Sequence, residues 1–112
     1  MTGVDVYNRA ITSLGYRDSQ VLKNKCLVVI NQVYEDLYSL VFGEYKPLMA
    51  LNEEVNLPER IVLNAMVYGV AEKLALGEGD GELQQYFAKA YDRAKARITT
   101  VDKVQDVFGG ML

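Results

Sequence analysis

Residues 57–98 read LPERIVLNAMVYGVAEKLALGEGDGELQQYFAKAYDRAKARI and contain two helical patterns separated by a glycine-rich loop. Pro58 suits the first turn of a helix and Glu59 suits its positive end, so a helix is predicted over residues 59–76. Three small residues in it, Ala65, Gly69 and Ala71, predict that another helix crosses it closely. The next helix is predicted over residues 82–98, where these side chains recur at helical spacing: Leu83, Phe87, Ala90, Tyr91, Ala94 and Ile98.

Two further helices are predicted on the N-terminal side of this pair. The first covers residues 3–14 and stops at Gly15, a natural helix terminator. Asp18-Ser19 supplies capping chemistry for the second, which is expected over residues 19–42. Its apolar stripe consists of Leu22, Cys26, Val29, Val33, Leu37 and Leu40, and is widened by Ile30, Tyr34 and Val41.

Residues 43–58 interrupt the helical periodicity. Lys46-Pro47 favours an extended or turn conformation, so a loop projecting from the bundle is predicted there. The spacing also allows a short hairpin around Asn52-Glu53-Glu54, with residues 48–51 and 55–57 as its arms. The predicted fold is therefore all-α: a four-helix bundle-like domain over residues 1–98, followed by a C-terminal arm over residues 99–112.

The composition excludes several classes of function. The chain has 112 residues, 15 acidic and 12 basic, giving a net charge of -3, with one cysteine and no histidine. The absence of histidine excludes Ser-His-Asp hydrolases and histidine-ligated haem, and makes a zinc enzyme untenable. A pI of about 4.9 argues against a general nucleic-acid binder. There is no secretory pattern and no apolar run long enough for a bilayer, so an intracellular origin without membrane contact is expected.

The motifs that could carry chemistry have simpler structural interpretations. Gly77-Glu-Gly-Asp-Gly81 lacks the spacing of a phosphate or dinucleotide loop and is interpreted as a turn with a helix cap. The acidic pairs Glu35-Asp36 and Glu53-Glu54 do not form the paired carboxylates of a magnesium site, and are interpreted as solvated charge. Cys26 lies on an apolar stripe and is interpreted as a buried hydrophobe. No catalytic residue, metal or cofactor is therefore expected, and the protein is predicted not to be an enzyme.

Two features remain as candidate contact surfaces. Lys89, Arg93 and Arg97 recur every four residues and form one basic row, which is either a solvated helix face or a row facing another subunit or DNA. The C-terminal arm either folds back on its own bundle or docks on another chain. Its large apolar residues are Val101, Val104, Val107, Phe108, Met111 and Leu112.

The third and fourth predicted helices resemble the head–tail connector (adaptor, neck) proteins of tailed phages and prophages. The resemblance lies in Leu57-Pro58, the stretch Ala65 to Ala75 with its Ala-x-x-x-Gly-x-Ala pattern, Gly79-Asp80, and Phe87 with Tyr91. Arg9-Ala10-Ile11-x-x-Leu14-Gly15 and the long second helix agree with it, so the similarity covers most of the chain. Each motif is common by itself; their order and spacing together carry the resemblance.

The resemblance implies a structural virion protein without catalytic residues. Its subunits would form a homo-oligomeric ring below the portal vertex, contact the portal protein and a tail or stopper protein, and extend the channel through which DNA passes without sequence-specific binding. The protein would then lie at the head–tail junction of the virion, and in the bacterial host cytoplasm during assembly. Loop residues expected to face a neighbour or the channel are Tyr45, Lys46, Leu48, Met49, Glu53 and Glu54.

An alternative function is a small helical DNA-binding or regulatory module that uses the basic row formed by Lys89, Arg93 and Arg97. Such a module would bind duplex DNA in a salt-dependent manner, with a slope of roughly three charges. The net charge of -3 and the lack of an evident helix-turn-helix pattern make it the second choice.

Overall fold

The computed structural model describes residues 1–40 and 46–98 of the chain. Its elements are α1 (Gly3–Leu14), α2 (Gln20–Tyr38), α3 (Glu59–Ile61), the π-helix η1 (Val62–Met66), α4 (Val67–Gly77) and α5 (Gly81–Arg97). Because α3, η1 and α4 follow one another without a break, they form one rod, and the described residues make four rods without a strand. The predicted all-α, four-helix fold is confirmed.

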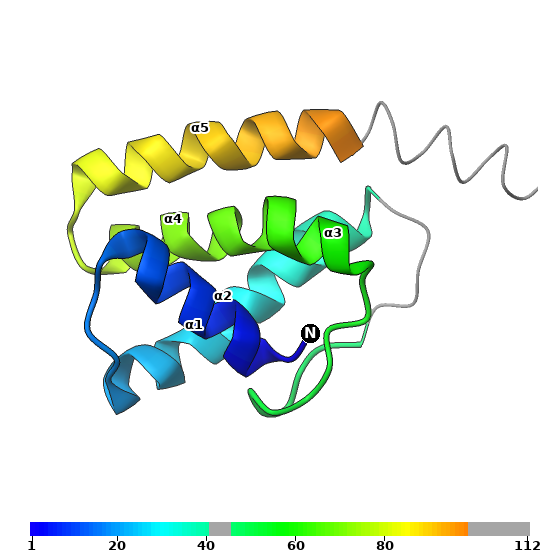
Figure 1. Ribbon diagram of the computed structural model, residues 1–112, viewed down its shortest axis with the longest axis horizontal. Coiled ribbons are helices and arrows are strands. Elements are labelled where there is room, and N and C mark those ends of the chain that lie inside the picture. The colour runs from blue at the N-terminus through cyan, green and yellow to red at the C-terminus, as the bar shows by residue number, and fades with distance from the viewer. Residues whose placement is uncertain (41–45, 99–112) are drawn as a thin grey trace, which may run out of the picture.

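Helix α4 is the central element, since it contacts α1, α2 and α5. Figure 1 shows α4 between α5 on one side and α1 and α2 on the other. The close crossing predicted at the small residues is confirmed at Gly69. A Cβ atom built there would lie 2.9 Å from both Val33 Cγ1 on α2 and Tyr91 Cε1 on α5. A glycine at this position therefore lets two helices approach the same turn of α4.

The N-terminal helix begins and ends where its sequence predicts. Thr2 and Asp5 form a capping box, in which each side chain accepts a hydrogen bond from the other residue's backbone N–H. At the other end Gly15 adopts the left-handed conformation, with φ of 74°. Because a left-handed residue at this position is readily provided by glycine, Gly15 ends α1 as expected.

Helix α2 is shorter than predicted. Ser19 caps its start through a 3.1 Å bond from Leu22 N to its Oγ, but the helix ends at Tyr38 rather than near residue 42. The cause is local: the Ser39 hydroxyl donates to Asp36 O, and Leu40 N donates to Leu37 O with i→i−3 geometry, which tightens the final turn. The described part of the predicted stripe is buried or partly buried: Ile30 and Tyr34 lie in the core, and Val29 and Leu40 lie at its edge. Val41, which was predicted to widen the stripe, lies outside the described residues.

The glycine-rich segment before α5 is a turn with a helix cap, as predicted. Gly79 has φ of 73°, and Asp80 Oδ1 accepts a hydrogen bond from Leu83 N at the start of α5. The other carboxylate oxygen of Asp80 accepts a 3.2 Å bond from the Tyr16 hydroxyl. This turn therefore also ties α5 to the segment that follows α1.

The loop prediction is wrong in two respects. Residues 46–58 contain no hairpin and do not project, because they pack against the start of α1 and bury Leu48 and Val55. Gly3 N donates to Glu53 O and Val4 N donates to Leu51 O, at 3.1 and 2.8 Å, and Val55 N donates to Met1 O. The first N–H groups of a helix need acceptors from outside that helix, and here the loop backbone supplies those for Gly3 and Val4.

Candidate functional site

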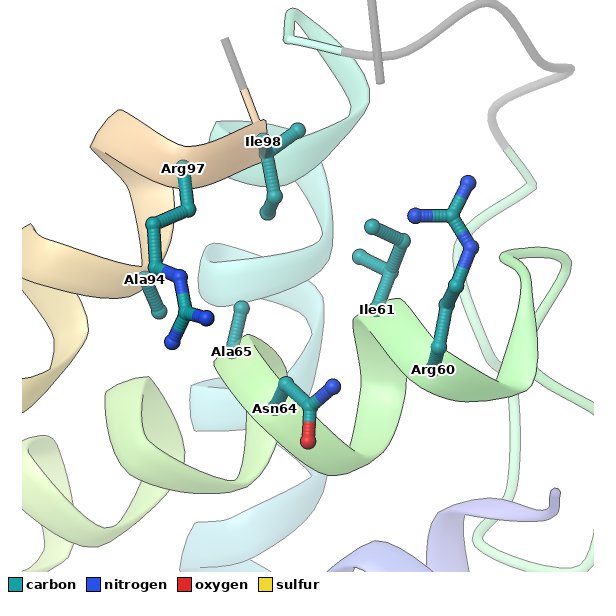
Figure 2. A pocket seen from close by; sticks show the side chains of 7 residues that line it. All are labelled: Arg60, Ile61, Asn64, Ala65, Ala94, Arg97 and Ile98. Atoms are coloured by element: carbon teal, nitrogen blue, oxygen red, sulfur yellow. The ribbon is translucent and has the colours of Figure 1, made fainter. Parts of the chain in front are cut away.

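A groove with a basic rim runs between α5 and the rod formed by α3, η1 and α4. We call it the basic groove and divide it into two compartments that share Asn64, Ala94 and Arg97. The first compartment has a volume of about 190 Å³. As Figure 2 shows, Arg97 reaches from α5 towards Ala65 and Asn64, while Arg60 stands at the other end, beyond Ile61. Its apolar lining consists of Ile61, Ala65, Ala94 and Ile98.

The second compartment is lined by aromatic side chains and has a volume of about 460 Å³. Tyr68 from α4 stacks on Phe87 from α5 with ring centroids 6.2 Å apart, and Tyr86 meets the Phe87 ring edge-on at 5.0 Å. Tyr86 is 66% exposed although it is a large aromatic residue. Ser13 of α1 and Arg93 of α5 complete the compartment with Ala90. An exposed tyrosine beside arginines is a composition typical of protein interfaces.

The π-helix places part of this groove. The backbone N–H of Val67 bonds to Val62 O, an i→i−5 pattern that accommodates one extra residue in the turn. Asn64 and Ala65, which lie within this wide turn, line the groove, and turns of this kind occur frequently at functional sites. No pattern in the sequence indicates this wide turn.

The predicted basic row is brought only partly into this groove. Lys89, Arg93 and Arg97 are all exposed on α5, and none of them forms an ion pair with a residue of the described part of the chain. Arg93 and Arg97 line the groove, whereas Lys89 lies outside it. The structure adds Arg60, Asn64, Tyr68 and Tyr86, which the sequence analysis missed. Helical spacing could have indicated Tyr86, because it lies seven residues before Arg93 and therefore shares its face.

A second, acidic groove lies on the opposite flank of α5. It has a volume of about 810 Å³ and runs between α5, α2 and α4. Its charged lining consists of Glu35, Asp36, Glu72 and Asp92, together with Lys73 and Lys95. Lys95 forms ion pairs with Asp36 at 3.3 Å and Asp92 at 3.8 Å, so part of this charge is neutralised within the chain.

Asp36 is the most strongly held acid of this acidic groove. Its carboxylate accepts hydrogen bonds from the Tyr91 hydroxyl at 2.6 Å and from Lys95 Nζ at 3.3 Å. Burial by itself would raise the pKa of Asp36, but these two hydrogen bonds, together with the positive charges of Lys95 and Lys73, outweigh it and lower that pKa below its usual value. Asp36 therefore remains a carboxylate at neutral pH.

The residues predicted to make loop contacts differ in their exposure. The prediction that Leu48 contacts a partner is wrong, because Leu48 is only 4% exposed and its side chain packs into the core. The side-chain amide of Asn31 on α2 bonds to the backbone N–H and C=O of Leu48, at 2.7 and 2.9 Å, and holds it there. Glu53 is half-buried and accepts a hydrogen bond from Met49 N. Lys46, Met49 and Glu54 remain exposed, and Glu54 forms an ion pair with the N-terminal amine. Tyr45 lies outside the described residues.

The candidate residues of the C-terminal arm lie outside the described residues as well. They are Val101, Val104, Val107, Phe108, Met111 and Leu112. The last described residue, Ile98, is 4% exposed and lines the first compartment of the basic groove.

Cys26 is fully buried in α2, and burial raises its thiol pKa to about 12. A thiol of this kind stays protonated at neutral pH and is a poor nucleophile. Within residues 1–40 and 46–98, no group of three or more cysteine, aspartate or glutamate side chains is arranged to hold a metal ion. None of the helices in the same ranges combines the length and the apolar character that crossing a membrane requires.

In comparisons with known proteins, the chain matches no protein family, no curated protein and no solved structure.

Proposed function

We propose that the chain is a structural subunit of a phage or prophage head–tail connector. It would form a homo-oligomeric ring that contacts the portal protein on one side and a tail or stopper protein on the other. Packaged DNA would pass through the ring without sequence-specific binding. The protein would reside at the head–tail junction of the virion, and in the bacterial cytoplasm during assembly.

One structural relationship carries this proposal. Two of the motifs that resemble the connector family, Ala-x-x-x-Gly-x-Ala on α4 and aromatic-x-x-x-Tyr on α5, meet in space. Gly69 of the first motif lies directly under the Tyr91 ring of the second, and a Cβ atom on Gly69 would lie 2.9 Å from that ring. This contact gives a physical reason for the two motifs to occur together. It supports the resemblance as one fold-forming unit rather than two unrelated coincidences.

Two surfaces of the chain also support a role as a ring subunit. A cyclic ring uses two different patches on each subunit, because each copy contacts one neighbour on either side. The basic and acidic grooves provide two such patches on opposite flanks of α5. A chain of 112 residues can then reach stability in an assembly through contacts repeated around an axis.

The test is genetic and structural. The gene is deleted from the phage or prophage genome that encodes it, and particles are examined by electron microscopy after induction. We expect filled heads without attached tails, restored by expression of the chain from a plasmid. Normal tailed particles from the deletion strain would refute the connector function. Light scattering and negative-stain images of the purified chain would show independently whether it forms closed rings.

A second candidate function, a small DNA-binding module, is favoured by one observation. The basic groove is lined by Arg60, Arg93 and Arg97 and by no acidic residue within the described part of the chain. Fluorescence anisotropy with a duplex oligonucleotide at several salt concentrations tests it. If the logarithm of the binding constant falls linearly with the logarithm of the salt concentration, with a slope that corresponds to roughly three phosphate contacts, the result would support this candidate. The absence of binding at low salt would exclude it.

A further inference from the structure

The two flanks of α5 carry opposite charge. The basic groove is lined by three arginines and no acid among the described residues, whereas the acidic groove is lined by four carboxylates and two lysines. The two surfaces are thus complementary in sign although they belong to one chain of net charge -3. Complementary potentials of this kind fix the orientation of a contact and exclude like-charged alternatives.

The helical repeat explains why one helix can present both surfaces. Tyr91 and Ala94 point into the core, and at 3.6 residues per turn this orientation places Arg93 and Arg97 on one flank and Asp92 and Lys95 on the other. The lining of the two grooves agrees with this arrangement. Because the flanks face in different directions, they cannot contact each other within one subunit. Each flank can, however, contact the complementary flank of a second copy.

The four carboxylates of the acidic groove differ in how many hydrogen bonds and ion pairs they already form within the chain. Asp36 is bonded to Tyr91 and Lys95, and Glu72 accepts a 3.3 Å hydrogen bond from Gln84 Nε2. Glu35 is exposed and forms no ion pair within the described residues. Asp92 is 76% exposed at its side chain, with a single 3.8 Å ion pair to Lys95. Glu35 and Asp92 are therefore the carboxylates most available to a partner.

We infer that the flank of α5 bearing the basic groove contacts the flank bearing the acidic groove in a second copy of this chain, with Arg93 and Arg97 facing Glu35 and Asp92 of the neighbour. Tyr86, which is exposed and meets the Phe87 ring edge-on in the same compartment as Arg93 and Arg97, supplies the apolar contact of this interface. The contact is head-to-tail, because it joins two different patches, and its repetition closes a ring or continues as a filament. The inference rests on the proposed connector function and names the surfaces by which that ring is built.

A second copy fits this groove better than DNA does. The whole chain is acidic, so long-range repulsion opposes a polyanion, and the arginines are accompanied by an exposed tyrosine and an apolar floor rather than by further lysines. Arginine with tyrosine is the combination enriched at the energetic centre of protein interfaces.

Charge reversal in two complementary variants tests the inference. One variant carries Arg93→Glu and Arg97→Glu, and the other carries Glu35→Lys and Asp92→Lys. The control carries Lys89→Glu and Arg17→Glu, which change the net charge by the same amount as the first variant but at exposed positions outside both grooves. Sedimentation velocity over a wide concentration range at low ionic strength measures self-association, and circular dichroism verifies that each variant is folded.

The wild-type chain and the control are expected to self-associate, and added salt is expected to weaken this association. Each reversed variant alone is expected to associate at least about tenfold more weakly, because like charges then meet. An equimolar mixture of the two reversed variants is expected to associate again, since both of its mixed contacts join opposite charges. Recovery on mixing is the result that a merely misfolded variant cannot give.

Three results would overturn the inference: a wild-type chain that stays monomeric throughout, reversal without effect, or a mixture that does not recover. Its failure and that of the connector function are distinguishable. Closed rings that are insensitive to reversal, together with tailless particles after gene deletion, would refute this interface and keep the connector. Association that recovers on mixing, together with normal particles after deletion, would keep the interface and refute the connector.

Discussion

The hydroxyl of Tyr91 donates a 2.6 Å hydrogen bond to Asp36 Oδ2 and thereby joins α5 to α2. Lys95 Nζ lies 3.3 Å from the same oxygen and 4.4 Å from the centroid of the Tyr91 ring. The Tyr91 ring is buried over Gly69, so packing holds the ring in place in addition to the hydrogen bond of its hydroxyl. This three-residue contact forms the wall between the core and the acidic groove.

Removing the hydroxyl while keeping the ring isolates the contribution of that bond. We expect Tyr91→Phe to lower the free energy of unfolding by about 1–2 kcal/mol, because Asp36 keeps Lys95 and half of its side chain stays exposed to water. Urea denaturation measures the change. Tyr86→Phe is the control: its ring is 66% exposed, its hydroxyl has no bond to a described residue, and no change is expected. Equal effects of the two variants would contradict the assigned role of the bond.

Stability is expected to fall as the pH rises above about 10. Burial, and then the hydrogen bond to Asp36, raise the pKa of Tyr91 above its usual value of 10.0, and burial also raises the pKa of Tyr7 and Tyr16. In the unfolded chain these tyrosines lose their protons near pH 10, whereas in the folded chain they keep them to higher pH. Alkaline pH therefore favours unfolding. Urea denaturation from pH 8 upwards measures this loss, and Tyr91→Phe should make it shallower. A pH dependence unchanged by that substitution would contradict the assignment to Tyr91.

Adding one methyl group at the helix crossing should be costly. In Gly69→Ala the new Cβ atom would lie 2.9 Å from both the Val33 side chain and the Tyr91 ring, so these side chains, or the helices that carry them, must shift. We expect a destabilisation of about 1–3 kcal/mol, measured by thermal denaturation. Gly77→Ala, where a Cβ atom meets nothing within 4 Å, is the matched control at the end of the same helix and should be neutral or slightly stabilising. An unaffected Gly69→Ala variant would show that the crossing is looser than the structure indicates.

The Asn31 side chain holds the loop of residues 46–58 against α2. Asn31→Ala removes both hydrogen bonds to the Leu48 backbone and leaves a partly buried N–H and C=O unsatisfied. We expect a loss of about 1–3 kcal/mol and faster hydrogen exchange at the Leu48 amide. Asn24→Ala, on the exposed side of α2, should change neither. If hydrogen exchange at the Leu48 backbone amide is unchanged in Asn31→Ala, the loop is held by its apolar contacts rather than by the side-chain amide of Asn31.

Deletion of residues 101–112 separates the arm from the bundle. The apolar cluster of the described residues already extends through all four helical rods to Ile98, so we expect the truncated chain to keep its helical circular dichroism and its melting temperature. Under the connector proposal we expect it to lose incorporation into particles, measured by complementation of the deletion strain. A truncated chain that is unfolded would place the arm in the core and refute its role in docking.

The sequence by itself determined the number of helical rods and the bounds of two of them. The bounds of α1 and α5 agree with the prediction to within one residue, because capping residues, glycine terminators and helical periodicity act within one or two turns of the chain. The close crossing at Gly69 was predicted for a similar reason, since a small residue on a buried face indicates a near neighbour. The all-α fold follows from these local signals.

The tertiary structure alone decided where the surfaces lie. The Asn31 amide joins backbone groups 17 residues away, and the carbonyls of Leu51 and Glu53 complete the first turn of α1, so the loop predicted to project is instead held against the bundle. Likewise the basic row became half of a groove only when α5 packed beside η1, which brought Asn64 next to Arg97. Local patterns specify which residues form a helix face. Which faces meet, and which stay open to a partner, depends on packing between segments far apart in the chain.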